Sequence, residues 1–307
     1  MPSKKYTNPL PRITIMSIGG RGATILDRLY AISSPQIQLV AVGMARSLEY
    51  ATKIDTKIEL PESGGIQSGV DIPRHARESV EVCEAEIRAA VAGSDMVFLV
   101  GNIATESNVY QVAAAAQIIR SMNVLTCFVG ATAFPFQGIE AERQVMIGER
   151  LVGEAVDGFL LVDSGKVLMM GNATEGLLQV NRVIEQMITM IIDIVHTHGL
   201  INIDFADVKS VIQSAGPLFF QSVEESENEI QEIKDGLFMH PSLNVPAISQ
   251  MKRVVYVLYA GSEVLMETVH EIASHIASQV HESAQILFGC VVDEQMKGKV
   301  KVVLIGA

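Results

Sequence analysis

Residues 177–195 read LLQVNRVIEQMITMIIDIV, and this stretch decides how the rest of the chain is organised. Apolar side chains recur on nearly every face of a helix with this sequence, instead of forming one stripe. A helix of that kind must be buried on all sides, so we expect it to lie between two sheet-containing units. The pattern predicts a long central helix over residues 174–198, with Gly199 in the usual C-cap place.

On the N-terminal side of this helix, short apolar runs alternate with amphipathic stretches. The runs ITIMSI (13–18) and DMVFLV (95–100) have the length and composition of buried strands, and helical patterns lie between such runs. Strands that alternate with helices predict βαβ units and a largely parallel sheet. We therefore expect a Rossmann-like domain over residues 13–173, preceded by a flexible arm over residues 1–12.

The C-terminal side predicts a second, smaller α/β domain over residues 213–307. An acidic stretch within it, residues 222–250, fits no single element. Elsewhere in this domain, apolar runs predict strands over 254–259, 284–292 and 300–305, and a periodic segment predicts a helix over 263–280.

The composition excludes several classes of protein. Of the 307 residues, 49% are hydrophobic and 19% are charged, which rules out an intrinsically disordered chain. The formal net charge of −12 argues against nucleic acid and against anionic membrane surfaces as partners. The longest apolar run, residues 187–195, is interrupted by Thr189 and Asp193 and is too short to cross a bilayer, so no membrane insertion is expected.

Cys83, Cys127 and Cys290 are isolated from one another, and the seven histidines form no ligand pair. This spacing is typical of reduced thiols in a cytoplasmic protein. It predicts no bound metal.

A glycine-rich segment, SIGGRGAT (17–24), links the first strand to a helix expected over residues 24–32. Such a turn lets backbone N–H groups approach a phosphate at a helix N-terminus, although an ordinary tight turn fits it equally well. The segment departs from the dinucleotide-binding pattern, because Ile25 stands where the third small residue belongs and no acidic residue ends the second strand. The sequence therefore disfavours a nicotinamide oxidoreductase.

A second motif, NIDFAD (202–207), directly follows the central helix. Asp204 and Asp207 flank the entry to the next helix, where two carboxylates can orient a water or hold a cation. Asp204 can equally cap that helix while Asp207 stabilises its first turn. Both roles stay open at this point.

Four segments, taken in order, resemble the FtsZ/tubulin superfamily and its FtsZ branch in particular: DMVFLV (95–100), LTCFVGATAFPFQG (125–138), GLINIDFADVKSVI (199–212) and ILFGCVVDEQMKGKVKVVLIGA (286–307). The resemblance implies an N-terminal GTPase-type domain with a parallel sheet, a long central helix and a smaller C-terminal α/β domain. It also implies that subunits stack head to tail. The loop and helix at 199–212 would then complete the nucleotide pocket of the next subunit.

The resemblance divides the site residues into a preserved group and an altered group. The catalytic loop matches fully, with Asn202, Asp204 and Asp207 in the places of the family's Asn and two Asp. The positions that the resemblance assigns to nucleotide contact are Gly19, Gly20, Arg21, Gly22, Thr24, Gly69, Thr105, Ser107, Asn108 and Asn181.

Many of the nucleotide positions depart from the family's pattern. Arg21 stands for a glycine and Thr24 for a guanine-reading Asn, while Asn181 keeps a guanine-reading amide. The family's glycine-rich signature loop is replaced by ATESNVY (104–110), in which no glycine remains and Glu106 places a carboxylate where phosphate would bind. Three further positions differ from the family: this chain has Leu177 where the family has a stacking Phe, Gln137 where it has a Glu, and Ala141 where it has an Arg.

These substitutions predict weak or absent binding of GTP or GDP, with Mg²⁺ only alongside a bound nucleotide. We expect a cytoskeletal protein that associates longitudinally with itself or with a genuine FtsZ, which it would cap. Two alternatives stay open: an active GTPase in which Thr105, Ser107 and Asn108 contact phosphate, and a nucleotide-independent scaffold. The chain ends at Ala307 directly after a strand, so no C-terminal adaptor-binding tail is expected.

Overall fold

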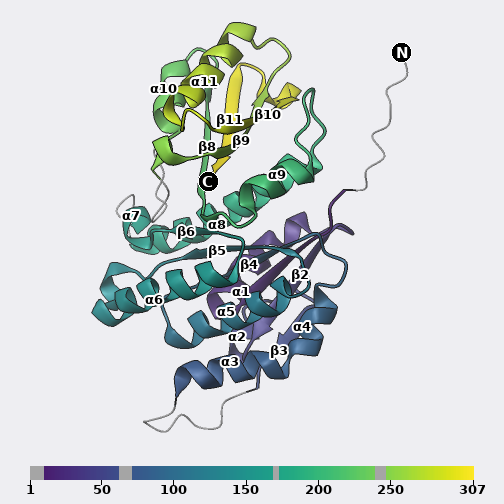
Figure 1. Cartoon of the computed structure of the whole chain (residues 1–307), viewed down its shortest axis with the longest axis vertical. Helices are drawn as coiled ribbons and strands as arrows, with labels where there is room; N and C mark the ends of the chain where they lie inside the picture. Colours follow the sequence, from purple (N-terminus) through teal and green to yellow (C-terminus); the bar gives the residue numbers. More distant parts are fainter. Residues whose placement is uncertain (1–9, 62–70, 169–172, 239–246) are drawn as a thin grey trace.

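The computed structural model describes residues 10–61, 71–168, 173–238 and 247–307. Its N-terminal part is built on a seven-stranded sheet with the order β3-β2-β1-β4-β5-β6-β7, in which every neighbouring pair is parallel (Figure 1). The strands are β1 Ile13–Ile18, β2 Ile37–Gly43, β3 Thr56–Glu59, β4 Met96–Asn102, β5 Leu125–Ala131, β6 Gly158–Val162 and β7 Gly216–Pro217. The predicted parallel sheet is confirmed. Every residue of β1, β5 and β6 is buried, which explains their continuous apolar sequences.

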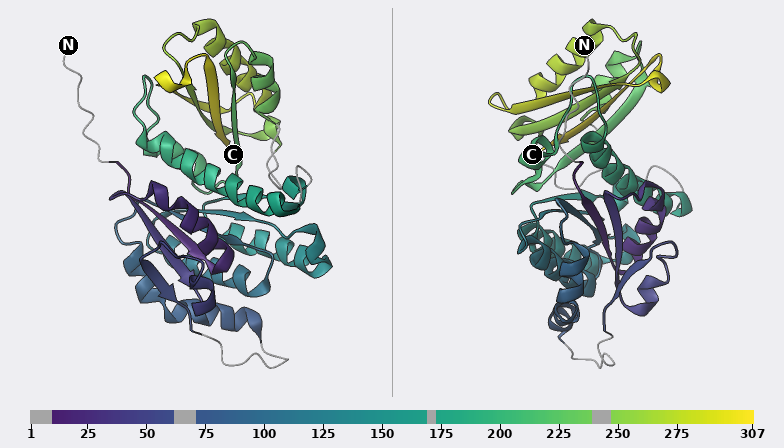
Figure 2. Two further views of the ribbon diagram at one scale, coloured as in Figure 1. Left: turned by 180° about the vertical axis from the view of Figure 1, so that it is seen from behind. Right: turned by 90° about the vertical axis from the view of Figure 1, so that its right-hand side faces the viewer.

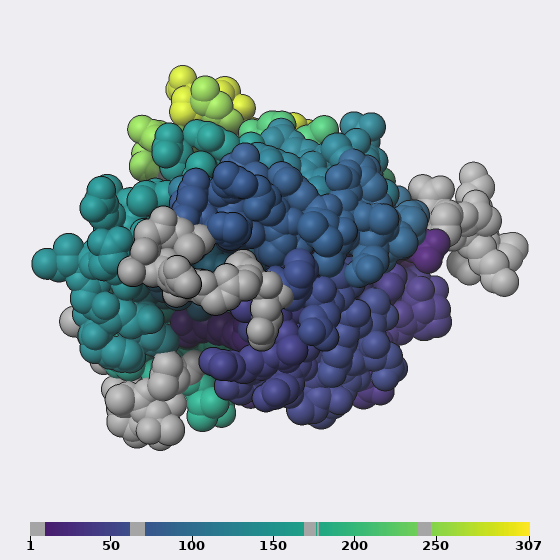
Figure 3. All heavy atoms as spheres, turned by 90° about the horizontal axis from the view of Figure 1, so that it is seen from below, coloured from purple at the N-terminus to yellow at the C-terminus, as the bar shows by residue number. Residues whose placement is uncertain are grey.

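Helices cover both faces of this sheet (Figure 2). The helices α1 (Gly19–Arg28) and α8 (Ala173–His196) pack on one face, in one apolar cluster. The opposite face is covered by α3 Ile72–Val82, α4 Glu84–Ala90, α5 Glu106–Arg120 and α6 Ile139–Ala155. The short helices α2 (Ala45–Leu48) and α7 (Ser164–Leu168) complete the domain, whose end farthest from the C-terminal domain is seen in Figure 3.

The glycine-rich segment is part of a helix, which corrects the prediction of a turn followed by a helix over 24–32. The chain passes from β1 directly into α1, and Gly19 makes the bend with a φ of +75°. An α-helical segment ends at Arg28 and a 3₁₀ turn follows over Leu29–Ile32. The three glycines therefore form the first turn of α1, where the absence of side chains permits close packing.

The smaller C-terminal domain has a four-stranded sheet with the order β10-β9-β11-β8, as predicted in outline. Its strands are β8 Phe219–Ser226, β9 Arg253–Ala260, β10 Gln285–Val292 and β11 Lys299–Gly306, and its helices are α10 Ile230–Gly236 and α11 Met266–Gln279. Only β9 and β10 pair in parallel. The unassigned stretch 222–250 contains the end of β8 and all of α10, and residues 239–246 lie outside the described ranges.

The central helix α8 lies between the two sheets, as expected (Figure 1). Its inner residues share one apolar cluster with side chains of β9 and β11. The prediction that it is buried on all sides is wrong, since Leu178 is 45% exposed and Arg182 and Gln186 also face solvent. The helix ends at His196, so Gly199 is not its C-cap. A side chain at Gly199 would instead meet the carbonyl oxygen of Cys290 in β10.

Within the described residues, no helix is both long enough and apolar enough to cross a bilayer. The same residues contain no cluster of His, Cys, Asp and Glu that is suited to hold a metal ion.

Candidate functional site

The direction of the chain connections reverses between the paired strands β1 and β4. The chain leaves β1 toward one face through α1 and leaves β4 toward the other face through α5. In open parallel sheets, ligands bind at the carboxyl ends of the strands where the order reverses in this way. Both altered nucleotide loops, residues 19–24 and 104–110, lie at this point.

The start of α1 is suited to a close approach by a ligand or by another backbone. Its first turn contains no acidic residue and receives no side-chain cap. A side chain at Gly22 would meet the carbonyl oxygen of Val100 in β4, so only glycine fits there. The Thr24 hydroxyl donates a hydrogen bond to the Gly20 carbonyl oxygen, 3.1 Å away, and is therefore occupied within the helix.

The start of α5 differs, because a side chain fills the space beside it. Thr105 is the N-cap residue of α5 but forms no capping hydrogen bond, and Glu106 lies in the first turn. Asn108 Nδ2 donates to the Asn102 carbonyl oxygen at 2.9 Å. Asn108 Oδ1 lies only 2.5 Å from the position that a Cβ atom on Gly19 would take. The Asn108 side chain thus occupies the gap between the first turns of α1 and α5.

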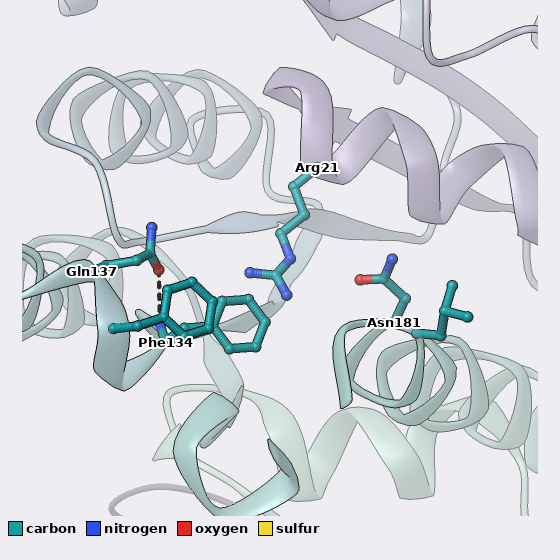
Figure 4. Close-up of a pocket in the computed structure, with 6 residues that line it drawn as sticks. Arg21, Phe134, Gln137 and Asn181 are labelled. Atoms are coloured by element: carbon teal, nitrogen blue, oxygen red, sulfur yellow. Dashed lines mark hydrogen bonds between the residues drawn. The ribbon is translucent and has the colours of Figure 1, made fainter. Parts of the chain in front are cut away.

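A pocket of about 450 Å³ lies beside these loops (Figure 4). It is lined by Arg21, Phe134, Phe136, Gln137, Leu178 and Asn181. The Arg21 guanidinium stands over the Phe134 ring, with its central carbon 4.7 Å from the ring centroid. The Phe134 and Phe136 rings stack on each other, with centroids 5.2 Å apart and an interplanar angle of 4°.

The loop that carries the two aromatic rings is held by its own hydrogen bonds. Gln137 Oε1 accepts from the Phe134 backbone N–H at 2.7 Å, and the Gln137 N–H donates to the Phe134 carbonyl oxygen at 2.9 Å (Figure 4). Our sequence reasoning did not single out Phe134, Phe136 or Leu178. The Phe-Pro-Phe spacing is the signal that would have identified two of them.

Two polar groups in this pocket lack partners. Arg21 forms no ion pair or hydrogen bond with any described residue, and burial lowers its pKa to about 10. Asn181 Oδ1 is buried and accepts no hydrogen bond from the described part of the chain. Because buried polar atoms are nearly always satisfied in folded proteins, Asn181 Oδ1 and the half-buried Arg21 make this pocket the candidate binding site.

The NIDFAD loop forms a well-ordered capping structure. Asp204 Oδ1 accepts from the Asp207 N–H at 2.9 Å, and Asp207 Oδ2 accepts from the Asp204 N–H at 3.1 Å. This reciprocal capping box begins α9 (Phe205–Ile212). Asn202 Oδ1 accepts from the Gly199 N–H at 2.7 Å. The capping role that the sequence left open is therefore present, and Asn202 and Asp204 remain exposed to solvent.

The structure brings together the described positions that the resemblance assigns to nucleotide contact, and it places the NIDFAD loop away from them. Asn181 lies near the start of α8, while Asn202 follows its end. At about 1.5 Å per residue, the helix alone separates the two groups by roughly 22 Å. Gly69 lies outside the described residues, and Leu177 belongs to the residues whose side chains are not described.

Comparison with known proteins agrees with this geometry. Residues 220–307 match the family model described as the FtsZ family, C-terminal domain. The chain is 23% identical over 309 residues to the cell division protein FtsZ of Aquifex aeolicus, an alignment that covers 98% of this chain and 84% of the relative.

Two solved structures show the same fold. An empty FtsZ dimer from M. jannaschii has a TM-score of 0.82 at 23% identity, covering 98% of this chain and 89% of that one. CetZ2 from Haloferax volcanii, in a GTPγS-bound protofilament, has a TM-score of 0.80 at 13% identity, covering 96% and 92%. Together with the C-terminal domain match, these similarities show that the chain has the fold of FtsZ and CetZ, with two sheet-containing domains around α8, and they support its resemblance to the FtsZ/tubulin superfamily.

Proposed function

We propose that this protein associates head to tail, with itself or with a genuine FtsZ, while it binds GTP weakly or not at all. The observation that carries the proposal is the position of Asn108, whose side chain fills the gap between the starts of α1 and α5. In the family, the polyphosphate of the nucleotide would lie along these two loops. Here the chain itself takes that space.

The energetic cost of placing a polyphosphate in this gap is considerable. The ligand would break the hydrogen bond from Asn108 to Asn102 and would bring phosphate charge next to Glu106. Each of these effects costs about 1–3 kcal/mol. Together they reduce a micromolar affinity to roughly the millimolar range.

The catalytic loop supports the other half of the proposal. Asp204 is exposed and Asp207 is half-buried, in a loop that is braced by the capping box and the Asn202 contact. Presented to a neighbouring FtsZ that holds GTP, Asp204 and Asp207 would assist hydrolysis there. The altered pocket at the other end of this chain would then fail to recruit the next subunit, so the chain caps the filament.

The relatives lend this proposal further support. One is described as a dimer and another as a protofilament, and the dimer is described as empty. By analogy with these relatives, we expect this chain to associate longitudinally. An active GTPase is less well supported, because Asn108, one of its three required phosphate contacts, already donates to Asn102.

Sedimentation and GTP turnover of FtsZ from the same organism would test co-assembly. With equimolar amounts of this protein, we expect it to appear in the FtsZ pellet, polymers to shorten and turnover to change. If neither the pellet nor the turnover changes, co-assembly is refuted.

The effect of Asn108 can be tested directly in the purified chain. We expect no GTP or GDP to remain bound after purification, which absorbance and chromatography of the denatured protein reveal readily because the chain has no Trp and 6 Tyr. Asn108→Gly opens the gap and should give measurable GTP binding by calorimetry, whereas Ser107→Gly, the control in the same turn, should not. Micromolar GTP binding by the native chain would contradict the proposal and favour the active GTPase.

A further inference from the structure

We propose that the pocket of Arg21, Phe134 and Asn181 binds a nucleoside monophosphate, meaning a planar ring with an N–H edge and a single anionic group, in preference to a triphosphate. The inference deepens the proposed function and rests on its claim that the polyphosphate space is closed. It identifies what the remaining pocket can hold.

The anionic group follows from Arg21. Its side chain extends from α1 into the space between Phe134 and Asn181 (Figure 4). A buried guanidinium normally pairs with a carboxylate, because an unpaired charge is costly to remove from water. No described residue supplies that anion. The contact with the Phe134 ring offsets only part of the cost, so an anionic ligand group completes the site.

The planar ring follows from the remaining lining. Phe134, Phe136 and Leu178 provide an apolar surface, and Phe136 and Leu178 are 67% and 45% exposed. Exposed aromatic surface at the mouth of a pocket is suited to stacking on a planar ring. The pocket volume of about 450 Å³ also lies within the range of small-molecule sites.

The N–H edge follows from Asn181. Its Oδ1 atom is buried without a hydrogen-bond donor, and it belongs to a residue that lines the pocket. A ring N–H of the ligand would satisfy this atom, whereas a ring with acceptors alone would leave it unpaired. Discrimination of this kind is strong, because leaving a buried polar atom unpaired costs the full desolvation penalty.

The restriction to one anionic group follows from the charges around the pocket. Arg21 is the single cation among the described lining residues. The neighbouring gap is filled by Asn108, and Glu106 adds negative charge at the start of α5. Further phosphates would find neither space nor countercharge there.

Calorimetry with GMP, guanosine, GTP and inorganic phosphate tests the inference. We expect GMP to bind, guanosine to bind about tenfold to a hundredfold more weakly because it lacks the charged partner of Arg21, and GTP to bind no more tightly than GMP. Arg21→Gln should reduce GMP affinity by the same factor and leave guanosine affinity unchanged. Arg182→Gln removes the same charge from an exposed position next to Asn181 and should change neither.

Three results would overturn the inference: no GMP binding, equal binding of GMP by native and Arg21→Gln protein, or inorganic phosphate binding as tightly as GMP. A gain in guanosine or GTP affinity in Arg21→Gly would also overturn it, by showing that Arg21 blocks the pocket. If GTP binds far more tightly than GMP, the proposed function is refuted. The change in GMP affinity caused by Arg21→Gln would still test whether Arg21 binds the anionic group.

Discussion

Two substitutions of Asp204 separate its structural role from the catalytic role that we propose for it. Asp204→Ala removes the oxygen that accepts from the Asp207 N–H at 2.9 Å and leaves that N–H at the start of α9 uncapped. Loss of an N-cap of this type lowers the free energy of unfolding by about 1 kcal/mol, within a range of roughly 0.5–2 kcal/mol. Asp204→Asn keeps an acceptor oxygen in the same place and removes only the charge. Because Asn caps helices about as well as Asp, we expect its cost to stay below about 0.5 kcal/mol.

Urea denaturation followed by circular dichroism measures the stability difference, and GTP turnover of a genuine FtsZ measures the catalytic effect. Both variants should lose any stimulation of turnover, although only Asp204→Ala should lose stability. Asp235→Asn, an exposed charge change in α10, serves as the control for net charge and should leave both readouts unchanged. Equal destabilisation by the two Asp204 variants would refute the capping argument. Full stimulation by Asp204→Asn would refute the catalytic role of the carboxylate.

Two further predictions concern packing and pH. Gly22→Ala places a methyl group against the carbonyl oxygen of Val100 and should lower the free energy of unfolding by about 1–3 kcal/mol. In the control Gly20→Ala the new carbon would have its nearest contact at 3.4 Å, so stability should be unchanged or slightly higher. Equal urea midpoints for the two variants would contradict this account of the glycines. Burial raises the pKa of Tyr256 to about 12, so this tyrosine loses its phenolic proton at a lower pH in the unfolded chain than in the folded one. Its contribution to the free energy of unfolding is therefore fully present below about pH 10 and should be lost as the pH rises toward about 12. Absorbance titration of the phenolate checks the second prediction, which fails if every tyrosine of the folded protein ionises near pH 10.

The fold could be predicted from the sequence wherever burial is complete. Strands such as β1 and β5 are apolar at almost every position because both faces of the sheet are covered, and continuous apolar runs are easy to recognise. β3 was missed because it has four residues, of which only Ile58 is buried. The exposed strip of α8 was missed for a different reason. Arg182 and Gln186, four residues apart, are its sign in the sequence and were obscured by the many apolar residues around them, whereas the exposure of the apolar Leu178 has no sign in the sequence.

The candidate site was predicted residue by residue but not as an arrangement. The resemblance placed Arg21 and Asn181 at nucleotide positions, yet nothing in the sequence says that Arg21 lies over Phe134, more than a hundred positions later. The sequence likewise cannot show that Asn181 Oδ1 is buried without a partner in the described part of the chain. That depends on the absence of a donor from the described residues of α1, of the turn at residues 134–137 and of α8 itself. One alternative made Asn108 a phosphate contact, and its hydrogen bond to Asn102, which depends on the local turn, could not be foreseen from the sequence.

The NIDFAD loop and the Arg21 pocket are held by different hydrogen bonds, so one can change while the other is kept. The loop is held by contacts that it makes itself, from Asn202 to Gly199 and between Asp204 and Asp207. It is also anchored by the backbone pairing of Ile201 with Cys290 of the C-terminal domain and by the burial of Ile203 in the apolar cluster around α8. None of these hydrogen bonds involves the loops around the Arg21 pocket. Substitutions such as those at residues 104–110 can therefore accumulate without disturbing the hydrogen bonds of the loop, which keeps the exposed surface that we propose it offers to a neighbouring subunit.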